Sequence, residues 1–257
     1  MKKKLGDFTG LAKNYSLYRP SYCPLVCKAI LGLVDKNNNE IDFVDVGAGT
    51  GIWTRMINHA GLNSTVAIEP NDDMRKHGIL DSQKTNITWV NGSGENTTLN
   101  DNSADLLSMA SSFHWVDFEK AIKEFSRVLR PGGFFTAVWN PRHIECNPLL
   151  VEIEEKLYEI APHIKRVSSG NSDFTDTLTE RLRNADVFSD AIYLEGFHTI
   201  KQTPEEYLGV WWSVNDIRAQ AGEDKFIQFM AFVEEKTSNL DFIETTYKTR
   251  AWLARVR

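Results

Sequence analysis

The residues most suited to chemistry in this sequence form the run Asp45-Val46-Gly47-Ala48-Gly49-Thr50-Gly51, which has three glycines within five positions. Glycine lets the backbone approach a ligand closely and adopt angles that other residues avoid. The run follows a predicted buried strand and opens a predicted helix at Ile52, whose first N–H groups are free to bind. A tight turn without a ligand is the alternative, but three glycines would be costly there. The run therefore predicts a ligand-binding loop.

A second residue, Glu69, indicates which ligand this loop binds. Glu69 ends the next predicted strand, 22 residues after Gly47. A carboxylate at that point can accept hydrogen bonds from both hydroxyls of an adenosine ribose. The dinucleotide pattern GxGxxG would place its third glycine where this sequence has Ile52. The sequence therefore favours an adenosine ligand other than a nicotinamide dinucleotide. The alternatives are a nicotinamide dinucleotide site and an ordinary strand-end acid without a ligand.

His114 is the first candidate for a general base. It follows the fourth predicted strand, which places it at the rim of the expected site, and histidine titrates near neutral pH. The side chains expected to line a substrate pocket are Trp115, Trp139, His143, Tyr207 and Trp211. The last two share one face of a predicted helix, although such a pair more often serves packing. No HxxxH motif or carboxylate cluster indicates a metal.

The hydrophobic pattern predicts the scaffold that positions these residues. Apolar, β-branched runs predict strands at 41–46, 65–68, 86–90, 104–109 and 133–139. A helix is predicted after the fourth strand by an apolar stripe at helical spacing: Phe118, Ala121, Ile122, Phe125, Val128 and Leu129. Asp117 is expected to cap this helix, and Pro131-Gly132-Gly133 to stop it before the next strand. Strands alternating with helices predict parallel pairing. The fold class is therefore α/β, a doubly wound, Rossmann-like, mostly parallel sheet with helices on both faces.

The C-terminal half is less regular. Helices are predicted at 148–160, 177–187, 204–213 and 222–236, and strands at 191–197 and 242–253. We interpret about 140–190 and 204–236 as lid or cap elements over the open edge of the sheet, within the same domain.

Composition narrows the functional class. A net charge of -6 and a pI near 5.6 disfavour a nucleic-acid-binding protein. No apolar stretch approaches the ~18–20 residues of a membrane helix, and the charged N-terminus lacks the apolar run of a secretory signal. Cys23, Cys27 and Cys146 have no CxxC spacing and indicate reduced thiols. The expected location is the cytoplasm, and the expected partner is a small-molecule substrate.

Together these motifs resemble a class I S-adenosylmethionine-dependent methyltransferase. The segments that carry the resemblance are VDVGAGTG, AIEPNDDM, Gly92-Ser93-Gly94-Glu95, FHWVD and EFSRVLRPGGFFTAVW. Within that superfamily the chain is similar to the small-molecule type 11 branch, which includes trans-aconitate-methyltransferase-like enzymes. Residues 8–22, with Tyr15, Tyr18 and Arg19, are similar to the segment that these proteins fold over the cofactor. The motifs cover about 8–140, and the C-terminal half matches loosely.

The resemblance implies S-adenosyl-L-methionine as the cofactor and S-adenosyl-L-homocysteine as the product. It assigns the cofactor contacts to Tyr15, Arg19, Gly47, Ala48, Gly49, Gly51, Glu69, Pro70, Ser93, Gly94 and Ala110. Among these, Arg19 would pair with the methionine carboxylate, although a surface arginine is the alternative. The family often has an acid where this chain has Ser93, and serine is a weaker substitute. The resemblance also suggests that the His114–Trp115 pair recurs irrespective of substrate, which fits a structural role.

The predicted function is methyl transfer to an O, N or C nucleophile of a small molecule by in-line displacement. We divide the single domain, 1–257, into a cofactor-covering segment (1–36), a cofactor-binding core (37–140), lid elements with a core strand near 191–197 (141–236), and a terminal strand (237–257). The alternatives are a non-catalytic cofactor-binding module or sensor, and an RNA or protein methyltransferase. Acidity disfavours RNA, and Ser108-Met109-Ala110-Ser111 stands where an NPPY-like tetrapeptide would be.

Overall fold

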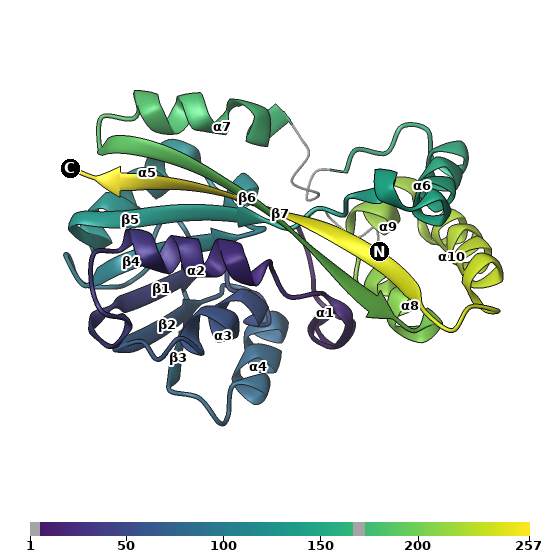
Figure 1. The fold of residues 1–257 in the computed structure, drawn as a ribbon, viewed down its shortest axis with the longest axis horizontal. Coiled ribbons are helices and arrows are strands. Elements are labelled where there is room, and N and C mark those ends of the chain that lie inside the picture. The colour runs from purple at the N-terminus through teal and green to yellow at the C-terminus, as the bar shows by residue number, and fades with distance from the viewer. Residues whose placement is uncertain (1–5, 167–172) are drawn as a thin grey trace.

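A single seven-stranded sheet forms the centre of the computed structural model, which describes residues 6–166 and 173–257 (Figure 1). Its strand order is β3-β2-β1-β4-β5-β7-β6. The strands are β1 (Asp42–Val46), β2 (Ser64–Ile68), β3 (Ile87–Val90), β4 (Ala104–Ala110), β5 (Leu129–Trp139), β6 (Phe188–Gln202) and β7 (Ile243–Val256). The strands β1 to β5 pair in parallel, and β7 is antiparallel to both β5 and β6. The predicted mostly parallel α/β fold is confirmed.

The order of the strands decides where the site lies. The parallel strand β1 pairs with β2 on one side and β4 on the other, so the direction in which successive strands are added to the sheet reverses at β1. Val46 and Ile68 are register partners at the carboxyl ends of β1 and β2. In open α/β sheets, ligands bind in the crevice beyond the carboxyl ends at this reversal. The glycine loop and Glu69 follow these two strand ends directly.

Alternating residues of the strands face two separate hydrophobic cores. Phe43 of β1 packs with the helices α2 (Pro24–Leu33) and α3 (Ile52–Asn58), whereas Val44 faces α5 (Phe118–Val128) and α7 (Asp173–Asn184). The helix α4 (Asp72–Asp81) lies beside β3, where Gly78 leaves room for the ring of Trp89. Figure 1 shows α2 and α3 in front of the sheet, α5 behind it, and α7 next to β6.

The junction between α5 and β5 differs in part from the prediction. Asp117 caps α5 as predicted, because its carboxylate accepts a hydrogen bond from the Lys120 N–H at 3.2 Å. The helix ends at Val128, however, and β5 begins at the next residue. The pairing with β4 then shifts register, so that Pro131-Gly132-Gly133 lie within a bulge of the strand instead of stopping the helix before it.

The long strands β6 and β7 carry a helical cap beyond the end of the sheet (Figure 1). Both are longer than the predicted 191–197 and 242–253. The cap consists of α6 (Pro148–Ile160), α8 (Pro204–Trp212), α9 (Asp216–Ala221) and α10 (Glu223–Thr237), which share their own hydrophobic core. The sequence pattern missed α9, which is only six residues long.

The helix α7 lies on the sheet and not in the cap. Its buried Leu178 and Leu182 pack with Phe188 and Trp252. The segment 167–172, which the sequence assigned to the lid, lies outside the described residues, as do residues 1–5. Short 3₁₀ turns occur at Asn38–Glu40, Phe113–Trp115 and Ile144–Cys146. In the described ranges, no helix is long and apolar enough to cross a membrane.

Candidate active site

The glycine loop has the backbone geometry that its composition predicts. Gly47, Gly49 and Gly51 all have positive φ, at 66°, 59° and 79°. A Cβ atom on Gly47 would lie 2.8 Å from Cβ of Ser112, so only glycine fits there. The Ala48 N–H donates to the Ile68 carbonyl at 3.0 Å, which fixes the loop to the end of β2.

A buried network beneath the loop joins β1, α3 and β4. Thr54 donates to one oxygen of the Asp45 carboxylate at 2.5 Å, and Ser108 donates to the other at 2.7 Å. The indole N–H of Trp53 donates to the Ser108 hydroxyl at 3.0 Å. Burial raises the pKa of Asp45 to about 7, and the nearby Glu69 carboxylate also raises it. The hydrogen bonds from Thr54 and Ser108 lower this pKa and offset part of the rise.

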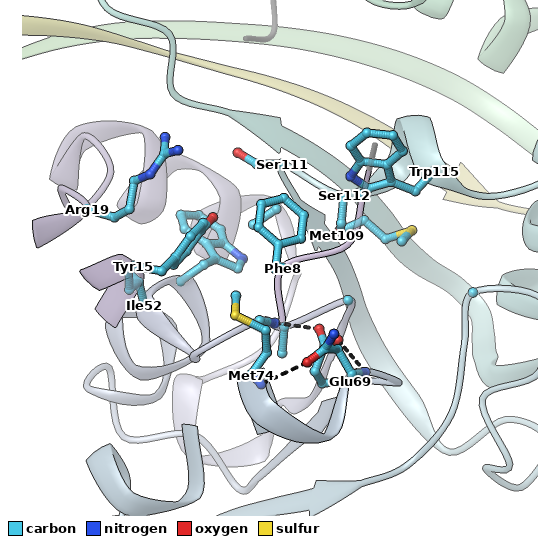
Figure 2. A pocket seen from close by; sticks show the side chains of 18 of the residues that line it. Phe8, Tyr15, Arg19, Ile52, Glu69, Met74, Met109, Ser111, Ser112 and Trp115 are labelled. Carbon is cyan, nitrogen blue, oxygen red and sulfur yellow. Dashed lines mark hydrogen bonds between the residues drawn. The ribbon is translucent and has the colours of Figure 1, made fainter. Parts of the chain in front are cut away.

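Glu69 lies at the floor of the site and is nearly buried. Its carboxylate accepts hydrogen bonds from the Gly49 N–H and the Asn71 N–H, each at 2.8 Å (Figure 2). Burial raises the pKa of Glu69, and these two backbone donors oppose that rise. Each carboxylate oxygen has two lone pairs, so one acceptor position per oxygen remains for a ligand.

A cavity of about 310 Å³ opens above Glu69 and the glycine loop. Its lining includes these predicted cofactor-binding and pocket residues: Tyr15, Arg19, Gly47, Ala48, Gly49, Glu69, Pro70, Ser93, Gly94, Ala110 and Trp115. Gly51 is outside this lining. It precedes α3, and a Cβ there would lie 2.9 Å from the ring of Trp89, so its role is in the turn itself.

The N-terminal segment, residues 6–22, covers this cavity. It contains the helix α1 (Ala12–Tyr18), and Phe8 meets Tyr15 edge to face at 5.9 Å. Figure 2 shows Glu69 and Arg19 on opposite sides of Phe8. The segment is held by Asp73, which accepts a hydrogen bond from the Gly10 N–H at 2.8 Å, and by the Tyr22 hydroxyl, which is 3.2 Å from Oγ of Ser111.

A second cavity of about 320 Å³ adjoins the first, between the sheet and the cap. The two share the lining residues Phe8, Tyr15, Arg19, Ser111, Asn140 and Tyr247. The second cavity alone is lined by Arg142, Glu154, Arg166 and Trp211. The site is therefore two connected compartments, one over the strand ends and one under the cap.

Comparison with known proteins agrees with this geometry. Residues 44–137 match the family model described as a methyltransferase domain. The chain carries a methyltransferase domain. An uncharacterized methyltransferase of Mycobacterium tuberculosis is 38% identical over 136 residues, which are 53% of this chain and 53% of that protein. The chain thus matches about half the length of this relative. The methyltransferase domain that the resemblance predicted is thus confirmed over residues 44–137, and these relatives do not single out the trans-aconitate-like branch.

Two further relatives extend the likeness. A ubiquinone/menaquinone biosynthesis C-methyltransferase of Caulobacter vibrioides is 24% identical over 216 residues, covering 77% of this chain and 85% of that protein. A solved structure from Anaeromyxobacter dehalogenans, provisionally named a type II methyltransferase, superposes with a TM-score of 0.68 and 19% identity, over 93% of this chain and 98% of that one. The structural likeness shows that the shared fold extends beyond residues 44–137.

The structure separates the residues predicted to line a substrate pocket. Trp115 lines the first cavity and Trp211 the second. Trp139 is 1% exposed and packs on Trp252 in the core, and Tyr207 is 1% exposed within the cap. His143 lies outside both linings, where its imidazole is 3.0 Å from the Glu145 carboxylate.

His114 is poorly placed to act as a general base. It lines neither cavity, and its ring lies against Trp115 and Trp139, with centroids 4.4 and 6.1 Å away. Within the described residues neither ring nitrogen has a hydrogen-bond partner. Burial lowers the pKa of His114 to about 4, so the imidazole is neutral near pH 7 and a weak proton acceptor. His114 does follow the end of β4 as predicted, but its ring packs against Trp115 and Trp139 and does not face a cavity.

Several residues that line the two cavities were not predicted from the sequence. Met74 and Met109 line the first cavity, and Arg142 and Tyr247 line the second compartment. Met74 lies in the quoted segment AIEPNDDM, three residues after the Asn71 cap of α4, so a local signal existed. Arg142 and Tyr247 come from a loop and from β7, and only the antiparallel pairing of the last strands brings them here.

Proposed function

We propose that this chain transfers a methyl group from S-adenosyl-L-methionine to an O, N or C nucleophile of a small molecule, releasing S-adenosyl-L-homocysteine. The observation that carries the proposal is Glu69, whose two oxygens are fixed by the N–H groups of Gly49 and Asn71 at the cavity floor. A carboxylate oriented in this way suits the vicinal hydroxyls of a ribose. The family match of residues 44–137 supports the same reading.

The residues of the first cavity fit such a cofactor. Glycine is required at position 47, and a Cβ on Gly49 would press on Met74 at 3.3 Å, so the loop keeps space for a ligand. The cavity has an acidic floor at Glu69, an apolar wall at Met74 and Met109, and a guanidinium at Arg19. These groups would hold the ribose, the adenine and the methionine carboxylate respectively, the last by a charge-assisted contact.

The protein's part in the reaction is to position the acceptor and exclude water. S-adenosylmethionine supplies an activated methyl group when bound. Proximity and orientation alone contribute roughly 7–11 kcal/mol to such a displacement. Phe8 and Tyr15 line both cavities, so the segment that covers the cofactor also faces the acceptor. The described residues of the first cavity offer no histidine as base, and the mechanism proposed here rests on alignment.

The chain's other properties support a small-molecule acceptor. The second compartment is enclosed by the cap and holds about 320 Å³, a size for a metabolite and not for a nucleic-acid strand. The net charge of -6 gives no general attraction to phosphate backbones. Three free thiols, Cys23, Cys27 and Cys146, fit a reducing compartment such as the cytoplasm.

Calorimetry with S-adenosylmethionine, S-adenosylhomocysteine and NADH tests the donor. We expect micromolar binding of the first two and none of NADH. Methyl-labelled donor is then incubated with enzyme and a metabolite extract, and labelled products are identified by mass. Tight donor binding without any labelled product would favour a sensor, and labelled RNA or protein would favour a macromolecular substrate. Absence of donor binding would overturn the proposal.

A further inference from the structure

The second cavity has the composition of an acceptor site for an anion. We propose, on the basis of the proposed methyl transfer, that it binds a small monocarboxylic acid with an apolar body, whose carboxylate pairs with Arg142 and whose reacting end lies beside Tyr247. The two cavities meet at Arg19, Ser111, Asn140 and Tyr247, so an occupant of the second reaches the first there.

Arg142 is held in place by the cap but keeps donors available. Its guanidinium stacks on the ring of Trp211 at 4.0 Å, and its Nη2 donates to Glu154 at 3.2 Å. Among the described residues, its Nη1 reaches only the Tyr207 hydroxyl, at 3.4 Å, which is a long hydrogen bond. A planar guanidinium fixed by stacking is preorganised for a carboxylate. Arg142 lines the second cavity and not the first, so it marks the end distant from the cofactor.

Within the described residues, the charges at the second cavity are three guanidinium groups and the carboxylates that pair with them. The cations are Arg19, Arg142 and Arg166. Arg166 pairs with both Glu154, at 2.5 Å, and Asp216, at 3.2 Å. Within the described residues, no carboxylate lies within ion-pair distance of Arg19. Three guanidinium groups therefore face two carboxylates. Glu145 also lines the cavity, but its side chain is 74% exposed and water screens it.

The donor carboxylate would take up Arg19, and Arg166 is already paired, so Arg142 is left with a donor for one acceptor carboxylate. This arrangement favours a monoanion over a di- or trianion. Burying a second or third carboxylate without a cation would cost more than the contact returns. The cavity also has an apolar surface on its cap side, formed by Ile144, Val210, Val214 and Trp211, whereas Ser111 and Asn140 add polar groups at the junction with the first cavity. An acid with an aliphatic or aromatic body fits both features.

Tyr247 supplies an unused donor at the junction of the two cavities. Its side chain is 3% exposed, and within the described residues its hydroxyl has no hydrogen-bond partner. An unpaired buried hydroxyl is costly, and a ligand atom at the junction would satisfy it. Burial raises the pKa of Tyr247 to about 12, so the group stays a neutral O–H donor. It can therefore hydrogen-bond the oxygen or nitrogen nucleophile of the acceptor.

The test compares acids with their neutral counterparts on the full chain loaded with donor. The probes are hydroxybenzoates, aminobenzoates, hydroxycinnamates and 3-oxo acids of four to eight carbons, each beside its primary amide, together with small di- and tricarboxylic acids. Methyl transfer from labelled donor gives kcat/KM, and calorimetry on the S-adenosylhomocysteine complex gives acceptor affinity. We expect at least one monoacid to exceed its amide about 10- to 100-fold, as for a charge-assisted contact.

Three variants test which residues produce the preference for the acid over its amide: Arg142→Met, Tyr247→Phe and a matched control. The control is Arg218→Met, because Arg218 is another cap arginine that stacks on aromatic rings, at 4.1 Å from Phe226, but lines neither cavity. Arg142→Met should lower the kcat/KM of the acid about 10- to 100-fold and leave that of the amide within threefold. Tyr247→Phe should lower both acid and amide, since it acts at the reacting end. Arg218→Met should change neither.

The contrary results distinguish the acceptor class, the role of Arg142 and the proposed function from one another. Equal use of acids and amides, preference for di- or tricarboxylic acids, or no acid binding to the S-adenosylhomocysteine complex would overturn the acceptor class. An equal fall for acid and amide in Arg142→Met would overturn the role of Arg142. If that variant does not fold, the ratio of acid to amide in the unmodified protein still decides the class. If the unmodified protein does not bind S-adenosylhomocysteine at all, the proposed function itself is refuted.

Discussion

Nε of Arg19 donates a hydrogen bond to Oγ of Ser213 at 2.7 Å, across 194 positions of the sequence. Ser213 in turn donates to the Val210 carbonyl at 2.5 Å, at the end of α8. The guanidinium also stacks on Tyr15, 5.1 Å from its ring centroid. The arginine that faces the cofactor cavity is thus oriented by the cap, which links the donor site to the compartment proposed for the acceptor.

This link predicts different effects for the two partners. Arg19→Met should weaken S-adenosylhomocysteine binding about 10- to 100-fold, because it removes a charge-assisted contact with the ligand carboxylate. Ser213→Ala should weaken it by less than tenfold, because the guanidinium remains and only its orientation is freed. Calorimetry of both variants makes the comparison. Equal losses would mean that Arg19 acts only through the cap.

Glu69→Gln should lower affinity for S-adenosylhomocysteine by about tenfold or more. The substitution keeps the size of the side chain but removes its charge, and the new amide group meets an N–H donor at Gly49 or Asn71. Glu155→Gln, on an exposed position of α6, is the matched control and should change nothing. Unchanged affinity in a folded Glu69→Gln variant would refute the ribose assignment.

Comparing the stability of Gly47→Ala with that of Gly10→Ala separates the cost of backbone strain from the cost of a steric clash. Both glycines have positive φ, which costs a residue with a Cβ roughly 1–2 kcal/mol. A Cβ at Gly10 meets nothing within 4 Å, whereas at Gly47 it lies 2.8 Å from Ser112. Urea unfolding should therefore show a larger loss for Gly47→Ala by at least about 1 kcal/mol. Equal losses would mean that Ser112 moves aside freely.

His114→Leu should leave methyl transfer within about threefold. The imidazole lines neither cavity, and its lowered pKa leaves it a weak base. Stability should stay the same or rise, because two buried ring nitrogens without partners are removed. Activity on the identified acceptor and thermal unfolding are the measurements. A fall in kcat of a hundredfold with normal donor affinity would restore His114 as the base.

The sequence predicted the fold and the donor side of the site because their signals are local. A strand followed by glycines, and an acid at the next strand end, are contiguous patterns that place Gly47, Gly49 and Glu69 together in any sheet of this order. Strand bounds in the parallel part agree within about two residues, except at β5. There the bulge at 131–133 is set by pairing with β4 and not by the propensity of Pro131 and Gly132.

The acceptor side depends on contacts between distant segments. Whether an aromatic residue faces a cavity or a core is decided by which elements pack around it, so Tyr207 and Trp139 lie in cores while Trp211 lines a cavity. Arg142 and Tyr247 meet through a bridge between a loop and β7, more than 100 positions apart. No periodicity within either segment contains that information.

Asp45 predicts a distinctive dependence of stability on pH. Burial raises its pKa to about 7 in the folded protein, whereas an unfolded chain has an ordinary carboxyl near 4. Between these values the folded state binds more protons, so this group's contribution to the free energy of unfolding falls as pH rises from about 4 to 7. Asp45→Asn removes that contribution. The free energy of unfolding of the variant, relative to the unmodified protein, should therefore rise by on the order of a few kcal/mol across this window and level off above it.

Urea unfolding at pH 4.5, 6 and 7.5, with exposed Asp35→Asn as control, measures the difference. Parallel pH profiles for Asp45→Asn and the unmodified protein would show that the Thr54 and Ser108 hydroxyls keep this carboxyl ionised throughout.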